Sequence, residues 1–361
     1  MTTTAGEAVE PRGPIRRLLH RYAHAPWWVH TLATLLAVAA VVVVAAVVSA
    51  FFFVDFVAER TALASGTPPQ TEVTGAEAKE LATRFAPELR YQQGELFKPI
   101  PRSAYLSRTQ LKVEAARKVH LLRDAVTEGD LPDSFEKAGS VALCFAACFL
   151  FLDVRGVEPH PPTGSQRAYA AISDKIFRSG TRPTVYYHVT KYDDTGEYAI
   201  QYWFLYLFNY RLNEHESDWE QITLRLNEDK EPIDALYSAH EGSNVKDWAA
   251  METDGDHPIV YSALGSHANY FKKGHPRVEV FCQKIIGRIK QCIKGRTVIV
   301  DLADGNGNVL KPGGYDLAQL SGPIFIGSYG SGNYVALMRK ADVLRDPRLR
   351  PVWQDPLGSI R

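Results

Sequence analysis

Carboxylates and a histidine lie close together in the segment His215-Glu-Ser-Asp-Trp-Glu220. The residues that follow, Gln-Ile-Thr-Leu-Arg-Leu, are typical of a β-strand. Alternation along this strand puts Asp218 and Glu220 on the face that carries Ile222 and Leu224. Two carboxylates on an apolar face lose hydration and repel each other. They therefore need a metal cation, an arginine or lysine, or a shared proton.

A divalent metal is one way to satisfy these carboxylates. His215 stands three residues before Asp218, where the connecting loop could fold back. Carboxylates with an imidazole bind divalent cations, and a set of ligands dominated by oxygen favours Ca²⁺, Mg²⁺ or Mn²⁺ over Zn²⁺. The competing interpretation is a salt-bridge cluster at the end of a strand, with no metal.

Two further histidines stand at the ends of predicted strands. His240 ends the strand that begins at Pro232, and His267 follows the strand from Pro258 to Leu264. Three histidines at the ends of neighbouring strands could converge at one rim of a sheet, although a single histidine is more often a structural residue. Residues expected to contact a ligand or to support the site are His240, His267, Trp219 and Tyr270.

One polar motif that contains glycine is a weaker candidate. Asp304-Gly-Asn-Gly-Asn308 partly resembles a calcium loop, but it lacks the glycine at the sixth place and the closing glutamate, so a turn is expected. No serine stands in a Gly-x-Ser-x-Gly nucleophile motif.

Charge is balanced, with 41 Lys and Arg against 41 Asp and Glu. This balance gives no reason to expect a nucleic-acid partner.

A hydrophobic segment near the N-terminus predicts a membrane anchor. Leu32 to Val54 is a run of 23 residues without a charged side chain, enough as a helix to cross a hydrocarbon core of roughly 30 Å. Arginines precede it and Asp55 follows it, so the positive-inside rule keeps the N-terminus cytoplasmic and exports the rest. The sequence predicts a single-pass cell-membrane protein with an extracellular domain. A cleaved signal peptide is the alternative.

Export would permit disulfides among the four cysteines. Cys282 and Cys292 stand ten residues apart and are the pair expected to form a bridge. Cys144 and Cys148 lie in an apolar run and are expected to be small core residues. Cross-pairing between the two groups stays open.

The remaining pattern predicts a mainly β protein. Its 17 Tyr, 16 Phe and 6 Trp suit pleated, half-buried surfaces, and strands are expected from Thr184 to Tyr192 and from Tyr198 to Phe208. The fold expected is an antiparallel β-sandwich with helical N-terminal additions and one N-terminal transmembrane helix. The parts expected are a basic tail (1–31), the membrane helix (32–54), a linker and short helix (55–83), the ectodomain (84–345) and a C-terminal tail (346–361).

Several motifs resemble those of the vacuolar protein sorting-associated protein 62-like family. They are His215-Glu-Ser-Asp-Trp-Glu220, Tyr237-Ser-Ala-His240, the run from His257 to Phe271, and the opening segments Phe85 to Tyr91 and Glu95 to Pro99. The resemblance spans roughly residues 84–340. This family implies no activity that can be carried over, because a shared fold does not transfer function.

A more distant resemblance is to the necrosis- and ethylene-inducing peptide-like proteins, which are secreted β-sandwich cytolysins. Their Gly-His-Arg-His-Asp-Trp-Glu motif holds a divalent cation near a sugar-binding surface. The resemblance implies metal ligands at Asp218, Glu220 and His215, although the family's histidine directly precedes its aspartate. That family has a further aspartate upstream of the motif, and the nearest polar candidate here is Asn209, which offers a carbonyl oxygen without charge.

Three functions are consistent with these observations. The first is an anchored binding module that recognises an envelope glycan or a lipid head group at a metal-containing rim. The second is a structural scaffold, in which the polar cluster only stabilises the sandwich. The third is a metal-dependent hydrolase with Glu220 or His240 as the general base.

Overall fold

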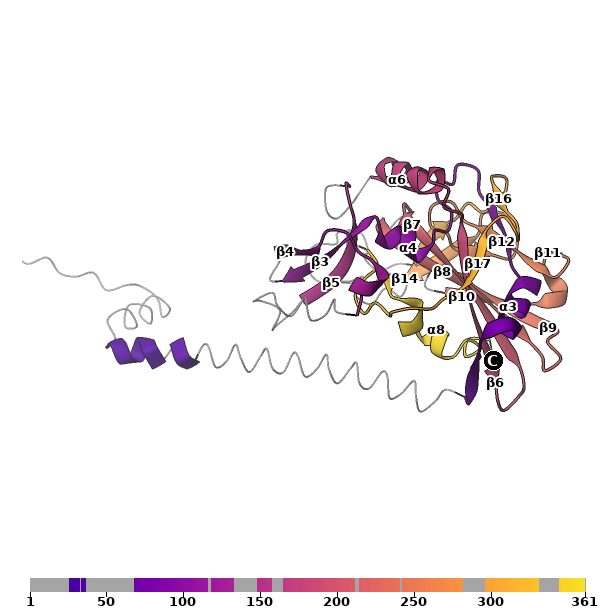
Figure 1. Cartoon of the computed structure of the whole chain (residues 1–361), viewed down its shortest axis with the longest axis horizontal. Coiled ribbons are helices and arrows are strands. Elements are labelled where there is room, and N and C mark those ends of the chain that lie inside the picture. Colours follow the sequence, from indigo (N-terminus) through magenta and orange to yellow (C-terminus); the bar gives the residue numbers. More distant parts are fainter. Residues whose placement is uncertain are drawn as a thin grey trace, which may run out of the picture. The chain divides into compact units, whose positions relative to one another are not determined.

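The computed structural model describes residues 26–32, 34–36, 68–115, 118–132, 148–157, 165–211, 214–240, 242–281, 296–330 and 344–360. The chain divides into two compact units, Met1–Ala62 and Leu63–Arg361. Figure 1 shows the strands and helices of the second unit, which carries every candidate site residue of the sequence analysis.

The first unit corrects the prediction of a transmembrane helix. Its described helical residues are 27–32 and 34–36, whereas a helix needs about 20 residues to cross a bilayer. In the described part of the chain, no helix has both the length and the apolar character needed to cross a bilayer. Residues 37–54 of the predicted span lie outside the described residues. The predicted single-pass localisation and the extracellular placement of the domain depended on that helix and are not supported by the described residues.

The largest sheet of the second unit has seven strands. Its path is β1 (Gln70–Val73), β6 (Thr184–Tyr192), β7 (Tyr198–Asn209), β8 (His215–Leu226), β9 (Pro232–Ala239) and β10 (Gly242–Asp247), with β17 (Asp316–Gln319) beside β6. Neighbours on the path pair antiparallel, whereas β17 runs parallel to β6. The hairpin of β6 and β7 and the following β8 and β9 confirm the strands expected from the aromatic and β-branched runs.

Three smaller sheets complete the strands. The five-stranded sheet contains β11 (Thr253–Asp254), β12 (His257–Ser262), β2 (Glu88–Tyr91), β16 (Val309–Leu310) and β13 (Asn269–Tyr270). The other two are β4 (Lys118–Arg123), β3 (Thr109–Ala115) and β5 (Cys148–Val154), and the pair β14 (Arg277–Phe281) and β15 (Arg296–Val300). The fold is thus mainly β and mostly antiparallel, with a parallel pairing of β12 and β2.

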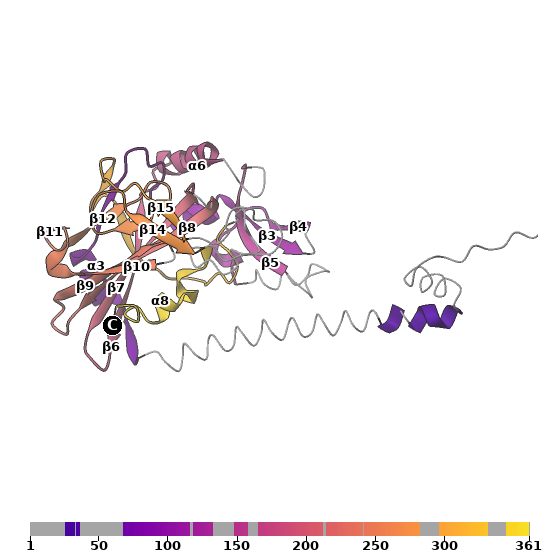
Figure 2. The ribbon, with the colours of Figure 1, turned by 180° about the vertical axis from the view of Figure 1, so that it is seen from behind.

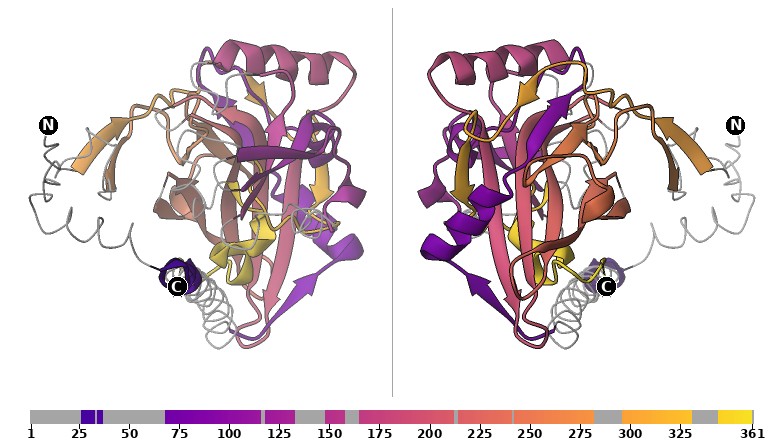
Figure 3. Two further views of the ribbon diagram at one scale, coloured as in Figure 1. Left: turned by 90° about the vertical axis from the view of Figure 1, so that its left-hand side faces the viewer. Right: turned by 90° about the vertical axis from the view of Figure 1, so that its right-hand side faces the viewer.

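Four α-helices are described in the second unit. These are α3 (Gly75–Arg84), α4 (Arg102–Leu106), α6 (Gln166–Arg178) and α8 (Pro351–Gln354), with short 3₁₀ turns at η1 (Glu128–Asp130), η2 (Trp248–Ala250) and η4 (Pro347–Leu349). Figure 3 shows α6 across one end of the long strands. Figures 1 and 2 place α3 on the opposite side of this unit from β3, β4 and β5.

One hydrophobic core joins the two larger sheets. Every residue of β7 is buried, so this strand is covered on both faces as its largely apolar and aromatic sequence predicts. Side chains from β7 and β8 pack in one cluster with Leu89 of β2 and Val260 of β12. The start of β8, which carries the polar segment, therefore lies in a protein interior and not on a solvated edge.

The residues after 343 pack on the seven-stranded sheet. Arg350 is 4% exposed and donates from Nη1 to the carbonyl of Trp219 at 2.9 Å. Its guanidinium also lies 5.2 Å from the ring centroid of Trp203. Further along the chain, Trp353 stacks on His188 with ring centroids 3.8 Å apart. These contacts tie the C-terminal segment to β6, β7 and β8.

The predicted disulfide is not found. Cys282 and Cys292 lie outside the described residues, as does Cys144, and Cys148 is the one cysteine whose backbone is described. The predicted Cys282–Cys292 bridge therefore lies wholly outside the described part of the chain. The segment Gln70–Val73, which lies in the predicted linker, forms β1 because its backbone pairs with β6.

The buried guanidinium leads to a first prediction. Arg350→Ala leaves the carbonyl of Trp219 without its donor and removes the contact with Trp203, so we expect the free energy of unfolding to fall by roughly 2–4 kcal/mol. Urea denaturation of the two proteins measures this change. Lys175→Ala on the exposed face of α6 is the control, and an equal stability of the Arg350 variant and the control would contradict the assigned packing.

Candidate functional site

The candidate site forms where four segments meet. β8 contributes the polar residues at its start, β9 contributes Ser238 and the following His240, and the loop between β12 and β13 contributes His267. The loop after β2 contributes Glu95. Tyr206 of β7 stands opposite Asp218 in the sheet register, so the central hairpin positions the floor of the site.

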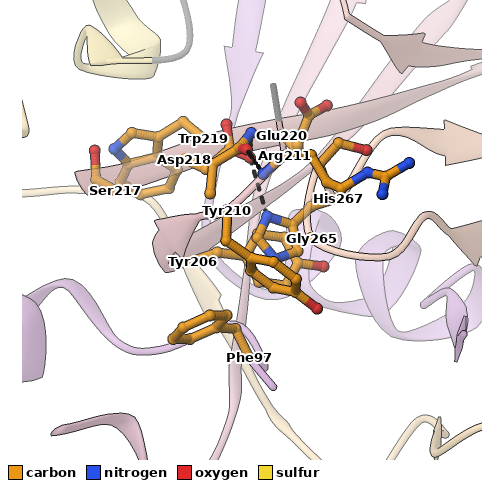
Figure 4. A network of polar contacts seen from close by, with 12 residues as sticks. Phe97, Tyr206, Tyr210, Arg211, Ser217, Asp218, Trp219, Glu220, Gly265 and His267 are labelled. Carbon is orange, nitrogen blue, oxygen red and sulfur yellow. Dashed lines mark hydrogen bonds and ion pairs between the residues drawn. The ribbon is translucent and has the colours of Figure 1, made fainter. Parts of the chain in front are cut away.

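His267 lies between two carboxylates. Its Nδ1 is 3.0 Å from Asp218 Oδ2, and its Nε2 is 3.5 Å from Glu95 Oε1. The side chains are 0%, 1% and 3% exposed for His267, Asp218 and Glu95. Figure 4 shows the imidazole beneath β8, with the dashed contact running to Asp218. We call these three side chains the His267 triad.

Aromatic rings hold the imidazole in place. Tyr206 stacks on His267 with ring centroids 3.8 Å apart and an angle of 4° between the planes. Phe97 packs edge-on at 6.3 Å, and Asn209 Nδ2 donates to Asp218 Oδ2 at 3.1 Å. The triad is thus enclosed by rings and by one amide, which keeps its charges away from water.

The charges of the triad stabilise one another. Burial alone would lower the pKa of His267, but the charge of Glu95 and the hydrogen bond to Asp218 outweigh it and raise this pKa to about 9. Burial would likewise raise the pKa of Glu95, but the charge and the hydrogen bond of His267 lower it, as do the N–H groups of Gly265 and Phe97. His267 is therefore an imidazolium at neutral pH.

Glu220 has a different environment. Its Oε2 accepts from Ser238 Oγ at 2.5 Å and from Asn269 Nδ2 at 3.4 Å. Burial and the negative charge of Asp218 raise the pKa of Glu220 well above its ordinary value, and the hydroxyl of Ser238 opposes this only in part. The two carboxylates of β8 therefore differ in their surroundings, because the imidazolium pairs with Asp218 while Ser238 and Asn269 contact Glu220.

This arrangement corrects the metal prediction. His215 donates from Nδ1 to the carbonyl of Ser217 at 2.7 Å, and burial lowers its pKa. In the described part of the chain, no three side chains of His, Cys, Asp or Glu are placed to hold a metal ion. The metal-binding prediction for Asp218, Glu220, His215 and Asn209 is therefore wrong, since His267 supplies the cation that the aspartate requires. The choice between Ca, Mg and Mn is left without a test.

A second cluster adjoins the first. His240 Nε2 is 2.7 Å from Asp301 Oδ2, and Tyr270 donates its hydroxyl to the same oxygen at 2.7 Å. Burial would raise the pKa of Asp301, but the hydrogen bond and the charge of His240 lower it. Asp301 is fully buried, whereas the side chain of His240 is 16% exposed. We call His240, Asp301 and Tyr270 the rim cluster, because its histidine reaches solvent.

The backbone is strained at both clusters. Ser217, His240 and His267 have φ values of 54°, 57° and 56°, and the described part of the chain has one further non-glycine residue with positive φ, Lys230. Such conformations cost free energy in residues with a side chain and gather at functional sites. Asp218 Oδ1 and Asn269 Oδ1 are also buried without a described hydrogen-bond donor, a further cost that native proteins seldom accept.

The predicted residues separate into two groups. Asp218 and His267 belong to the His267 triad, and His240 and Tyr270 belong to the rim cluster, whereas Glu220 contacts Ser238 and Asn269. Trp219 instead packs edge-on against Tyr329 at 5.6 Å.

Two site residues were missed by the sequence analysis. Glu95 and Asp301 lie 123 and 83 positions from Asp218. The available signal for Asp301 was a lone carboxylate in an otherwise apolar predicted strand, Thr297 to Leu302.

Comparison with known proteins supports the first resemblance. Residues 194–299 match the family described as vacuolar protein sorting-associated protein 62, which confirms for this segment the likeness seen in the motifs. The matched segment runs from the turn before β7 to β15 and includes Asp218, Glu220, His240 and His267. It is therefore the segment that carries most of both clusters. No curated protein matches the chain.

Solved structures of necrosis- and ethylene-inducing proteins resemble the chain, but with low identity and low TM-scores. Necrosis and Ethylene inducing Protein 2 from the causal agent of cocoa's witches' broom disease has 14% identity and a TM-score of 0.32, over 57% of this chain and 72% of its own. NLPPya in complex with glucosamine has 18% identity and a TM-score of 0.30, over 54% and 66%. These neighbours are of the kind that the second resemblance named. At such scores they carry no argument about the site or its ligand.

The His267 triad leads to a prediction for pH. The raised pKa of His267 contributes stability that is fully present below its unfolded value of about 6.5 and is lost as pH rises through about 9. We expect the free energy of unfolding to fall by about 3 kcal/mol across this window from this group.

Urea denaturation between these pH values measures the loss. In His267→Asn the fall should disappear, and asparagine tolerates the left-handed backbone of this position. A wild-type profile as flat as that of the variant would contradict the assigned imidazolium.

Proposed function

We propose that the chain is a non-catalytic binding module that takes a glycan at the rim cluster. The observation that carries this proposal is the strained backbone. Three of the four described non-glycine residues with positive φ belong to the rim or to the segments beneath it. Strain of this kind persists where the surrounding structure holds a site in its working conformation. In this proposal the His267 triad is the buried support and the rim cluster is the contact surface.

The chemistry of the rim suits a sugar. The imidazole of His240 is partly exposed and its orientation is held by Asp301, so the ring nitrogen that does not face Asp301 can bond a hydroxyl group. Two half-buried aromatic rings pack against segments of the site. Tyr210 covers Gly265 so closely that a Cβ there would be 2.7 Å from the ring, and Phe271 stacks on Tyr237 at 3.8 Å. Oriented polar groups beside aromatic faces are the usual means of binding ligands that combine apolar and hydroxyl surfaces.

A structural scaffold is the second candidate. The observation that favours it is the internal satisfaction of the His267 triad, in which the charges of Asp218 and Glu95 are both met by the same imidazolium. A scaffold would lose stability when His267 is replaced, but it would bind no sugar. The hydrolase hypothesis is weaker, since the described residues offer no group of three ligands for the metal it requires.

A glycan array with the full chain tests the binding module. We expect the wild-type protein to bind a subset of the sugars and His240→Asn to bind them at least tenfold more weakly. Asparagine keeps the left-handed backbone accessible, so the variant removes the imidazole with little change in the loop. Thermal denaturation of both proteins checks that the fold is kept.

Lys175→Ala on α6 is the matched control and should bind as the wild type does. Binding that is equal in wild type and His240→Asn would contradict the placement of the ligand at the rim. Absence of any bound sugar from the array would overturn the binding module and leave the scaffold as the better account.

A further inference from the structure

A basic bend adjoins the rim cluster. Lys272 and Lys273 follow Tyr270 by two and three residues, and Arg277 begins β14. All three side chains are exposed. Gly274 lies between them and has a φ of 144°, a backbone conformation that residues with a side chain rarely adopt.

Hydrogen bonds fasten this bend to the rim. Gly274 and Ala303 exchange backbone hydrogen bonds at 2.9 and 3.2 Å, and the N–H of Asp301 donates to the carbonyl of Pro276 at 3.0 Å. His275 and Asp304 meet at 2.9 Å beside the same bend. The bend is thus hydrogen-bonded to the segment that carries Asp301, the partner of His240.

The cations of the bend are not neutralised within the described structure. Lys272, Lys273 and Arg277 form no ion pair with another described residue. Exposed cations elsewhere do so, since Arg84 pairs with Asp256 and Lys311 pairs with Asp254. Exposed like charges repel one another weakly, and an anionic partner would relieve that repulsion.

The surrounding sequence is also basic. The 29 residues from Lys272 to Val300 contain eight Lys and Arg and a single acidic residue, Glu279, in a chain whose formal net charge is zero. Basic charge is therefore concentrated in the stretch that includes the bend. Charge segregated in this way steers and selects an anionic partner.

We propose that the glycan bound at the rim is acidic, and that Lys272, Lys273 and Arg277 contact its sulfate, phosphate or carboxylate groups. This inference rests on the proposed function and adds the class of ligand. The rim cluster bonds the hydroxyl groups of the sugar, and the bend bonds its anionic groups. Because the cations are exposed, their attraction is screened by salt and weakens as ionic strength rises.

Dextran sulfate and neutral dextran are the probes, because they share one sugar backbone and differ in charge. The full chain should bind dextran sulfate and not dextran, and binding should weaken at least tenfold between about 0.05 M and about 0.5 M salt. In Lys272→Glu/Lys273→Glu the binding of dextran sulfate should fall at least tenfold at low salt. Isothermal titration calorimetry measures all of these affinities.

The matched control is Lys79→Glu/Lys175→Glu, which makes the same change in net charge at exposed positions of α3 and α6. It should retain the wild-type affinity. An equal loss in both double variants would overturn the inference, because the attraction would then depend on net charge and not on the bend.

Further outcomes separate this inference from the proposed function. Neutral sugars of the array bound as tightly as dextran sulfate, without dependence on salt, would overturn the acidic ligand while leaving the glycan-binding module in place. Absence of binding to every sugar on the array and to dextran sulfate would overturn both. Vesicles of anionic phospholipid bound in preference to dextran sulfate would also overturn the acidic glycan, since the anionic group would then belong to a lipid.

Discussion

The imidazolium of His267 is the interaction on which the rest of the site depends. Asp218 is placed in the interior by the alternation of β8, whose neighbouring positions are all buried. A carboxylate there requires a positive charge, and the loop between β12 and β13 brings one at 3.0 Å. Because the same imidazolium also meets Glu95, a single cation joins β8, the loop after β2 and the loop after β12.

This joint explains why strained backbone is tolerated nearby. His267 adopts a left-handed conformation that places its ring between Tyr206 and the two carboxylates, so the electrostatic gain offsets the local cost. His240 has the same conformation at the end of β9 and turns its ring to Asp301. The buried His267 triad therefore fixes the segments that carry the rim cluster, whose histidine reaches solvent.

Sequence reasoning identified the strands and one side of the network. The aromatic runs predicted β6 and β7, and alternation placed Asp218 and Glu220 on a buried face in need of a counter-charge. Alternation is local, however, and cannot show which distant residue supplies that charge. Glu95, the second carboxylate at His267, precedes Asp218 by 123 positions. Its contact with His267 depends on the pairing of β12 with β2. A metal was predicted because a histidine three residues away is visible in the sequence, whereas His267 becomes a partner only after folding.

The protonation of His267 tests this account most directly. Nuclear magnetic resonance of the protein with ¹⁵N-labelled histidine reports both ring nitrogens as pH is raised. The account predicts that both carry protons at neutral pH and that the ring titrates with a pKa of about 9. A neutral ring at pH 7, titrating near the ordinary value of about 6.5, would contradict it, because Asp218 and Glu95 would then lack the cation that holds the site together.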